Sequence, residues 1–99
     1  MAYTYILLST AQEEYESSIS WYGERSWAAA GQFAEAIDHA LELICEHPFR
    51  WRNEYRNYYE IGVKKFPFSI MYTVDEDQEI VIISAVYHHS RNPKKKYRK

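Results

Sequence analysis

Cysteine is almost absent from this chain of 99 residues, since Cys45 is the only one. A single thiol cannot form an intrachain disulfide, which excludes the bridged scaffolds of small secreted proteins. The three glycines are scattered, so there is no glycine-rich loop to hold a phosphate. No apolar run reaches the roughly 18 residues that a membrane-spanning helix needs, and the first residues lack the pattern of a signal peptide. We therefore expect a cytoplasmic protein with no membrane partner.

Aromatic residues, by contrast, are abundant. Ten Tyr and three Trp contribute to an aromatic content of 17%, within a hydrophobic content of 46%. This composition indicates a folded globule rather than a disordered chain. Tyr and Trp combine a large apolar body with a polar group, so they suit both cores and interfaces. At this length we expect one domain that spans residues 1–99.

Charge is distributed unevenly along the chain. Residues 85–99 contain six of the twelve Lys and Arg residues and no acid. The other six cations and all fourteen acids precede them, which leaves that part of the chain at a net charge of −8. The basic C-terminal tail, from about residue 90 to 99, predicts a local site for an acidic partner. The alternative is a solvated tail that only keeps the protein soluble.

Apolar spacing predicts two helices in the first half of the chain. A strand is expected over residues 3–9, followed by a helix over residues 10–25 that opens with a capping box at Thr10. A second helix is expected to begin near Ser26 or Trp27 and to be ended by Pro48, and the two helices are expected to form an antiparallel hairpin. The apolar stripe of the second helix is expected to face a sheet and includes Phe33, Ile37, Leu41 and Ile44.

The second half of the chain alternates apolar and polar residues with a period of two. Strands are expected over residues 58–64, 68–74 and 79–86, with a polar turn at residues 75–78. The last strand is apolar on both faces, as is typical of a central strand. The predicted order β-α-α-β-β-β indicates an α+β fold, with the helices on one face of a mainly antiparallel sheet.

Histidine and cysteine show no spacing typical of a metal site. His88 and His89 are adjacent, so in a strand they point to opposite faces. On the second helix, His39, Cys45 and His47 do not share a face at the i, i+4 spacing that a helical site favours. Cys45 falls on the apolar stripe, which predicts a core residue rather than a nucleophile. We expect neither a metal nor a cofactor.

Three segments together resemble a known family. They are Trp21-Tyr22 in the first helix, KKFPFSIMY at residues 64–72 and AVYHHSRNP at residues 85–93. This combination is similar to the RelE/ParE superfamily of bacterial toxins, the toxic components of type II toxin–antitoxin systems. The resemblance extends from about Tyr3 to Tyr97. It implies a sheet that carries an N-terminal helical hairpin, and a cognate antitoxin as partner.

The resemblance implies one of two activities. RelE-like members cut messenger RNA on the ribosome, whereas ParE-like members inhibit DNA gyrase. RNA cleavage by 2′-hydroxyl attack needs proton carriers and cations around the phosphate. Nuclease relatives usually carry an Arg inside the third strand, where this chain has Ser69, and a hydroxyl does not replace a bidentate guanidinium. If the chain is a ribonuclease, the resemblance makes the catalytic candidates His88, Arg91, Tyr97 and Lys65.

We therefore favour the ParE-like branch, in which the toxin acts by binding DNA gyrase and is not an enzyme. The residues expected to contact the target or the antitoxin are Trp21, Tyr22, His88, Arg91, Lys94, Lys95, Lys96 and Arg98. The alternative from a different functional class is the RelE-like ribonuclease, with the ribosome and messenger RNA as partners. A third possibility is a non-toxic relative that only binds a partner.

Overall fold

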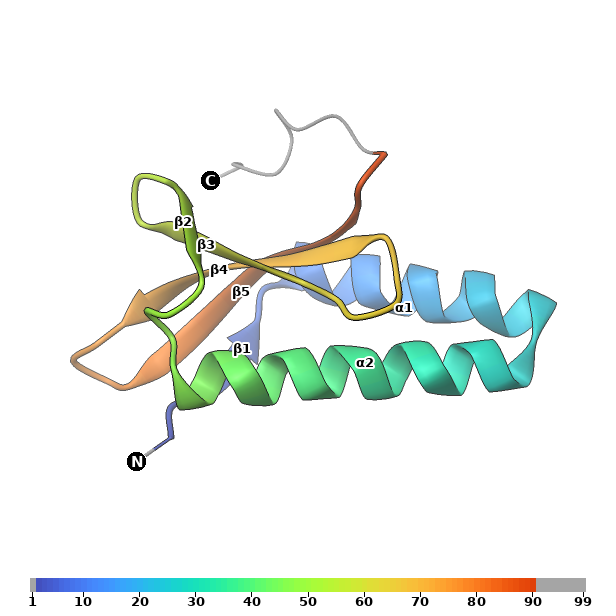
Figure 1. Ribbon diagram of the computed structural model, residues 1–99, viewed down its shortest axis with the longest axis horizontal. Coiled ribbons are helices and arrows are strands. Elements are labelled where there is room, and N and C mark those ends of the chain that lie inside the picture. The colour runs from blue at the N-terminus through green and yellow to red at the C-terminus, as the bar shows by residue number, and fades with distance from the viewer. Residues whose placement is uncertain (1, 91–99) are drawn as a thin grey trace.

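The structure is a computed structural model that describes residues 2–90 (Figure 1). Its elements in chain order are β1 (Thr4–Leu7), α1 (Ser9–Arg25), α2 (Trp27–Glu46), β2 (Arg52–Tyr55), β3 (Tyr58–Gly62), β4 (Phe68–Asp75) and β5 (Ile80–His88). The predicted α+β order is confirmed. The structure adds one short strand, β2, that the alternation pattern does not indicate.

The two helices form the predicted antiparallel hairpin, with Ser26 alone between them. The Ser26 hydroxyl accepts a hydrogen bond from the N–H of Ala29 at 3.2 Å and so caps the start of α2. The capping box predicted at Thr10 is wrong, because Thr10 lies inside the first turn of α1 and no side chain caps that helix. The Thr10 hydroxyl donates instead to the carbonyl of Ser84 at 3.5 Å, so a tertiary contact with β5 replaces the local one.

The sheet has the strand order β1-β5-β4-β3-β2, in which β1 is parallel to β5 and all other pairs are antiparallel. β5 is an interior strand, paired with β1 on one side and with β4 on the other, which agrees with its two apolar faces. A bulge interrupts the pairing of β4 with β5: Met71 pairs with Ala85, but Tyr72 pairs with Ile83. Ser84 is the extra residue, and its hydroxyl donates to the Met71 carbonyl at 3.2 Å.

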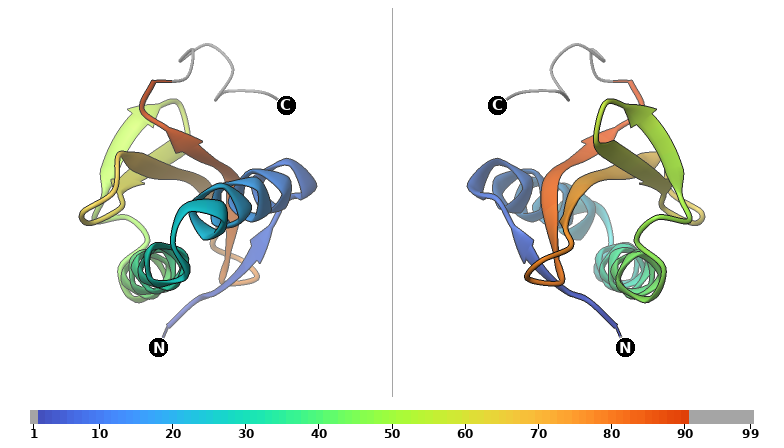
Figure 2. Two further views of the ribbon diagram at one scale, coloured as in Figure 1. Left: turned by 90° about the vertical axis from the view of Figure 1, so that its right-hand side faces the viewer. Right: turned by 90° about the vertical axis from the view of Figure 1, so that its left-hand side faces the viewer.

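The main core lies between the sheet and the two helices, which cover the same side of the sheet (Figure 2). The predicted stripe of α2 is buried, with Phe33 and Ile44 fully inaccessible to solvent. It packs with Val81 and Ile83 of β5. The Tyr72 hydroxyl, which is also buried, donates to the Pro48 carbonyl at 2.7 Å and ties the end of α2 to the sheet.

The opposite side of the sheet carries a smaller cluster of buried side chains, Met71, Ala85 and Tyr87, against which Tyr58 packs. No helix residue belongs to this cluster within the described part of the chain. The Tyr87 hydroxyl donates to a carboxylate oxygen of Glu60 at 2.7 Å. The two sides of the sheet therefore differ, one apolar beneath helices and the other a mixture of apolar and polar contacts.

Candidate partner-binding site

A hollow opens where α1 packs against the C-terminal end of β5. Its volume is about 260 Å³, and it is lined by Ser17, Ser18, Trp21, Tyr22, Phe68 and His88. Three of the residues predicted to contact a partner, Trp21, Tyr22 and His88, thus line one surface. They come from a helix and from a strand far apart in the sequence, so only the fold brings them together.

The adjacent aromatic residues of α1 have different surroundings. Tyr22 is half-buried, and its ring lies 5.1 Å from that of Phe33 and 5.4 Å from that of Phe66, measured between centroids. Trp21 is 51% exposed, and the guanidinium of Arg25 lies 3.7 Å from its ring centroid. Arg25 also donates to the Trp21 carbonyl at 2.8 Å, which holds the guanidinium on the indole. Tyr22 therefore anchors the wall of the hollow, whereas Trp21 presents its ring to solvent.

His88 forms the wall of the hollow opposite α1. Its ring meets that of Phe68 edge-on, with 5.1 Å between centroids. Its Nδ1 accepts a hydrogen bond from the backbone N–H of Ser90 at 3.0 Å and lies 2.8 Å from the Ser90 hydroxyl oxygen. Because Nδ1 is the acceptor, the neutral ring carries its proton on Nε2. No carboxylate, Lys or Arg of the described chain lines this hollow, so it suits the docking of an aromatic or aliphatic side chain better than proton transfer.

His89 occupies different surroundings, as expected for adjacent residues of a strand. Its Nε2 lies 2.9 Å from the hydroxyl of Ser69, a residue that is only 3% exposed. The His89 ring also lies near Tyr87, with 6.5 Å between centroids. Sequence reasoning missed this hydrogen-bonded pair, because Ser69 and His89 are twenty residues apart and meet only through the pairing of β4 with β5.

The remaining predicted site residues are less closely grouped. Lys65 is exposed in the loop between β3 and β4, where its φ of 71° places it in the left-handed region. The same loop approaches the end of β5, since the N–H of His89 donates to the Pro67 carbonyl at 2.9 Å. The basic tail lies outside the described residues, and with it the predicted residues Arg91, Lys94, Lys95, Lys96, Tyr97 and Arg98.

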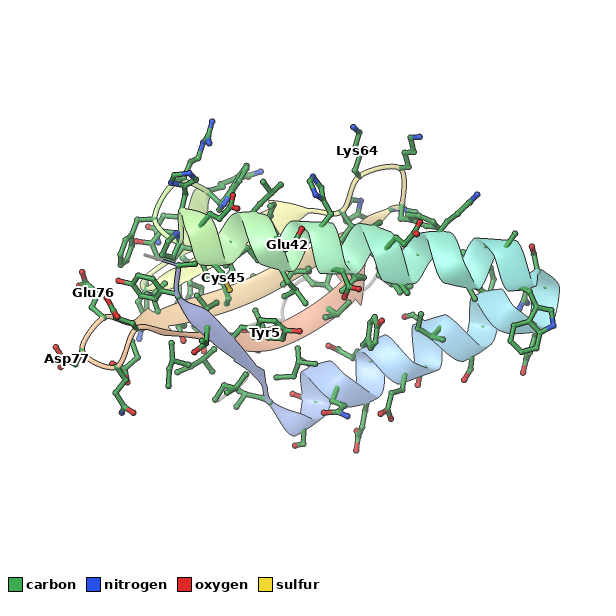
Figure 3. All side chains as sticks on the ribbon, turned by 90° about the horizontal axis from the view of Figure 1, so that it is seen from below. Tyr5, Glu42, Cys45, Lys64, Glu76 and Asp77 are labelled. Atoms are coloured by element: carbon green, nitrogen blue, oxygen red, sulfur yellow. The ribbon has the colours of Figure 1, made fainter. Side chains whose placement is uncertain are left out.

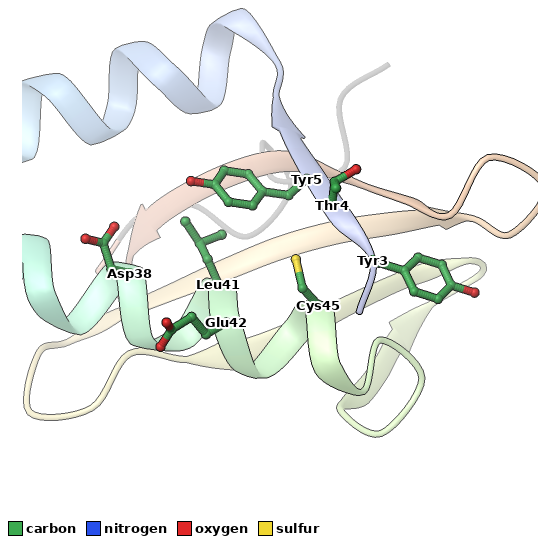
Figure 4. A pocket seen from close by; sticks show the side chains of 7 residues that line it. All are labelled: Tyr3, Thr4, Tyr5, Asp38, Leu41, Glu42 and Cys45. Carbon is green, nitrogen blue, oxygen red and sulfur yellow. The ribbon is translucent and has the colours of Figure 1, made fainter. Parts of the chain in front are cut away.

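A larger hollow of about 590 Å³ lies between β1 and α2 (Figures 3 and 4). The side chains of Tyr5 and Asp38 line it together with Cys45. Cys45 is only 7% exposed, and burial raises the pKa of its thiol. A thiol with a raised pKa is less often the nucleophilic thiolate at neutral pH. Cys45 therefore behaves as the core residue that its place on the apolar stripe predicts.

Neither a metal-binding cluster nor a membrane-spanning helix occurs among the residues that the structure describes. No cluster of three or more His, Cys, Asp or Glu side chains is placed to hold a metal ion there. None of the helices there is long and apolar enough to cross a membrane.

The fold is that of a known class of bacterial toxin. The free E. coli toxin RelE, in a double-mutant form, has 16% sequence identity and a TM-score of 0.63, covering 91% of this chain and 86% of the other. A crystal structure of isolated E. coli RelE gives the same identity and TM-score, covering 95% and 92%. The RelBE2 toxin–antitoxin complex of Mycobacterium tuberculosis has a chain with 17% identity and a TM-score of 0.59, covering 89% and 99%. At such identities these likenesses show the fold.

The family is shown by the sequence itself. Residues 5–93 match the family described as the ParE toxin of the type II toxin–antitoxin system parDE, and the chain belongs to this family. The predicted membership of the RelE/ParE superfamily is therefore confirmed. The protein is the toxin component of a type II toxin–antitoxin system, with a cognate antitoxin as partner. Among curated proteins, none matches the sequence.

Proposed function

We propose that this toxin inhibits DNA gyrase by binding it and does not cleave RNA. The observation that carries the proposal is the position of Ser69, where nuclease relatives usually carry an Arg. Ser69 is 3% exposed, and its hydroxyl lies 2.9 Å from Nε2 of His89. A short buried hydroxyl that already has a partner cannot clamp a phosphate as a guanidinium does. The match to the ParE family over residues 5–93 supports the same branch.

Net charge also supports binding to a protein rather than to ribosomal RNA. Residues 2–90 carry six Lys and Arg side chains against fourteen acids. Nonspecific affinity for RNA comes largely from cations, so a body with a net charge of −8 docks poorly on a polyanion. The basic tail is the exception, and we propose that Arg91, Lys94, Lys95, Lys96 and Arg98 contact an acidic surface of the target or of the antitoxin.

We propose further that the hollow beside α1 is the anchoring point for the target or the antitoxin. Trp21, Tyr22 and His88 line it, and exposed Trp is among the residues that most often dominate the energy of an interface. An apolar side chain of the partner would fill the hollow, while the basic tail would supply long-range attraction. This division of roles is common, since buried anchors determine affinity and peripheral charges mainly increase the association rate.

A supercoiling assay with purified gyrase, run beside primer extension on translated message, tests the proposal. We expect inhibited supercoiling and no new ends in the message. Trp21→Ala should weaken inhibition roughly 30-fold, which corresponds to about 2 kcal/mol for an interface anchor. Trp27→Ala is the matched control, because Trp27 is 89% exposed and lies outside the hollow. Codon-positioned cuts that disappear in His88→Ala, with supercoiling unaffected, would instead identify a ribonuclease.

A further inference from the structure

The two edges of the sheet differ in how well they are protected against pairing with another strand. At one edge, the pairing of β2 with β3 contains a bulge, and β2 begins with the charged Arg52. Bulges and charged side chains are common means by which edge strands avoid pairing with other chains. At the other edge, β1 has the sequence TYIL, without a charge or a proline, and its register with β5 is regular. β1 is therefore the edge that is open to a further strand.

The pairing of β1 with β5 determines which backbone groups of β1 face outward. Thr4 and Leu8 each donate their backbone N–H to a carbonyl on the β5 side, at 3.1 and 3.0 Å. In a strand the backbone groups of successive residues point alternately to the two edges. The N–H and C=O groups of Tyr5 and Leu7 therefore point away from β5.

The C-terminal end of α2 covers one end of this edge. Tyr3 points the same way as Tyr5 and Leu7, and its N–H donates to the Cys45 carbonyl at 3.0 Å. Among the residues that the structure describes, no strand lies beyond β1, and the outward groups of Tyr5 and Leu7 form no backbone hydrogen bond. Hydrogen bonds to a further strand are therefore possible at these two positions.

The open part of the edge borders the larger hollow between β1 and α2, the one of about 590 Å³ (Figure 4). Tyr5 lines this hollow on the side of β1, and Asp38, Leu41 and Glu42 line it on the side of α2. A smaller hollow of about 60 Å³ shares Tyr5, Asp38 and Leu41 with it and extends it to Tyr15 of α1. The two hollows form one groove beside the edge, which we call the β1 groove. This groove has room for side chains of a strand that pairs with β1.

The surroundings of the open edge are apolar and negatively charged. Tyr5 and Ile6 point to opposite faces of β1 and are 44% and 48% exposed, so an added strand would cover apolar surface on both faces. Asp38 and Glu42 share one face of α2, are exposed, and form no ion pair within residues 2–90. Their charge is complemented by a strand that carries Lys or Arg. A second copy of β1 supplies no cation, because residues 2–9 are uncharged.

We propose that the β1 groove binds an extended segment of another protein that carries apolar residues and at least one Lys or Arg. The backbone of this segment bonds to Tyr5 and Leu7 and adds a sixth strand to the sheet. Its side chains alternate, so every second one enters the β1 groove, where the cation meets Asp38 or Glu42. The β1 groove shares no lining residue with the aromatic hollow beside α1. This binding site therefore goes beyond the proposed function, and either site can fail its test without affecting the other.

Amide hydrogen exchange of the full-length toxin, followed by NMR, tests where the segment binds. The probe is a ten-residue peptide with blocked ends, in which every second residue is Thr and the others alternate between Val and Lys. We expect the peptide to slow exchange of the Tyr5 and Leu7 amides at least ten-fold. The amides of Thr4 and Ile6 should be unchanged, because they already face β5. Equal slowing at all four amides, no slowing at millimolar peptide, or equal slowing by a peptide with Glu in place of Lys would overturn the proposal.

Two matched double variants test whether the acids of the β1 groove attract the peptide. Asp38→Asn with Glu42→Gln should weaken peptide binding roughly five-fold, because each exposed ion pair contributes little. Glu35→Gln with Glu46→Gln removes the same charge from α2 outside the β1 groove and should leave the affinity unchanged. An equal effect of both double variants would overturn the proposal, because the attraction would then be nonspecific. So would slow exchange of Tyr5 and Leu7 that develops with toxin concentration in the absence of peptide, since the edge would then pair with a second copy.

Discussion

The two sides of the sheet hold their buried residues by different means. Beneath the helices, side chains such as Phe33, Ile37 and Ile70 form one apolar core. On the other side, Met71 and Tyr87 belong to a small cluster with hydrogen-bonded polar groups beside it. The stabilisation that apolar burial provides is proportional to the buried area and has no preferred direction. A hydrogen bond, in contrast, fixes two groups in one geometry.

One side of the sheet is expected to supply most of the stability of the fold, and the other side to fix the positions of the strands. The helix-covered side supplies most of the buried apolar area, so it should dominate the free energy of unfolding. The other side uses short hydrogen bonds: Tyr87 of β5 bonds to Glu60 of β3 across the intervening strand β4, and Ser69 of β4 bonds to His89, which follows β5. These bonds should contribute less to stability while they hold β3, β4 and the C-terminal end of β5 in position.

The largest effect is expected from Ile37→Ala, on the helix-covered side. Ile37 is 3% exposed and belongs to the main core. Removing its outer carbons leaves a cavity, so the free energy of unfolding should fall by about 2–5 kcal/mol. Urea denaturation followed by circular dichroism measures this change. An unchanged midpoint would show that this face of α2 is not packed against the sheet.

A smaller effect is expected from Tyr72→Phe, which removes a buried hydroxyl on the same side. The Pro48 carbonyl then loses its donor at 2.7 Å. An unsatisfied buried acceptor should cost about 1–3 kcal/mol of unfolding free energy at neutral pH.

The stabilising effect of the Tyr72 hydroxyl is also expected to depend on pH. Burial raises the pKa of Tyr72 above its ordinary value of 10.0. Because the unfolded phenol ionises first, the stability that Tyr72 contributes is complete below that value and is lost as pH rises above it. The stability difference between wild type and Tyr72→Phe should therefore narrow above pH 10.0. A constant difference up to pH 11 would mean that the phenol ionises equally in both states.

A third prediction concerns Tyr87→Phe, the matched change on the other side of the sheet. The hydrogen-bond length is again 2.7 Å, but the acceptor is the partly exposed carboxylate of Glu60. Water can hydrate that carboxylate in the variant, so the loss should be about 0.5–1.5 kcal/mol. If Tyr87→Phe destabilised the protein more than Tyr72→Phe in parallel urea titrations, the distinction between the two sides would be wrong.

The smallest effect is expected from Ser69→Ala. The hydroxyl of Ser69 is buried, but its partner His89 is exposed and can bond to water instead. The expected loss is about 0.5 kcal/mol, at the low end for a hydrogen bond. The His89 ring signals should shift in the NMR spectrum while those of His88, which bonds to Ser90, stay in place. Equal shifts for both rings would show that the two histidines do not have separate surroundings.

Local pattern in the sequence was enough to predict the helical hairpin, the buried stripe of α2 and the interior position of β5 in the sheet. Ser26 and Pro48 bound α2 as expected, because capping and chain termination depend on neighbouring residues. The different surroundings of His88 and His89 were predicted from the two-residue repeat of a strand, in which adjacent side chains point to opposite faces. The family resemblance carried by residues 64–72 and 85–93 was likewise present in the sequence alone.

Contacts between distant segments were decided only by the tertiary structure. The bulge at Ser84 and the short strand β2 depend on how strands pair, which no local pattern of the sequence expresses. The capping box at Thr10 was mispredicted, because Thr10 lies inside the first turn of α1, where its hydroxyl donates to the carbonyl of Ser84, far along the chain. The aromatic hollow likewise exists only because α1 packs on β5 and brings Trp21 to His88. Periodicity describes one element at a time, whereas a site is formed by the register and packing between elements.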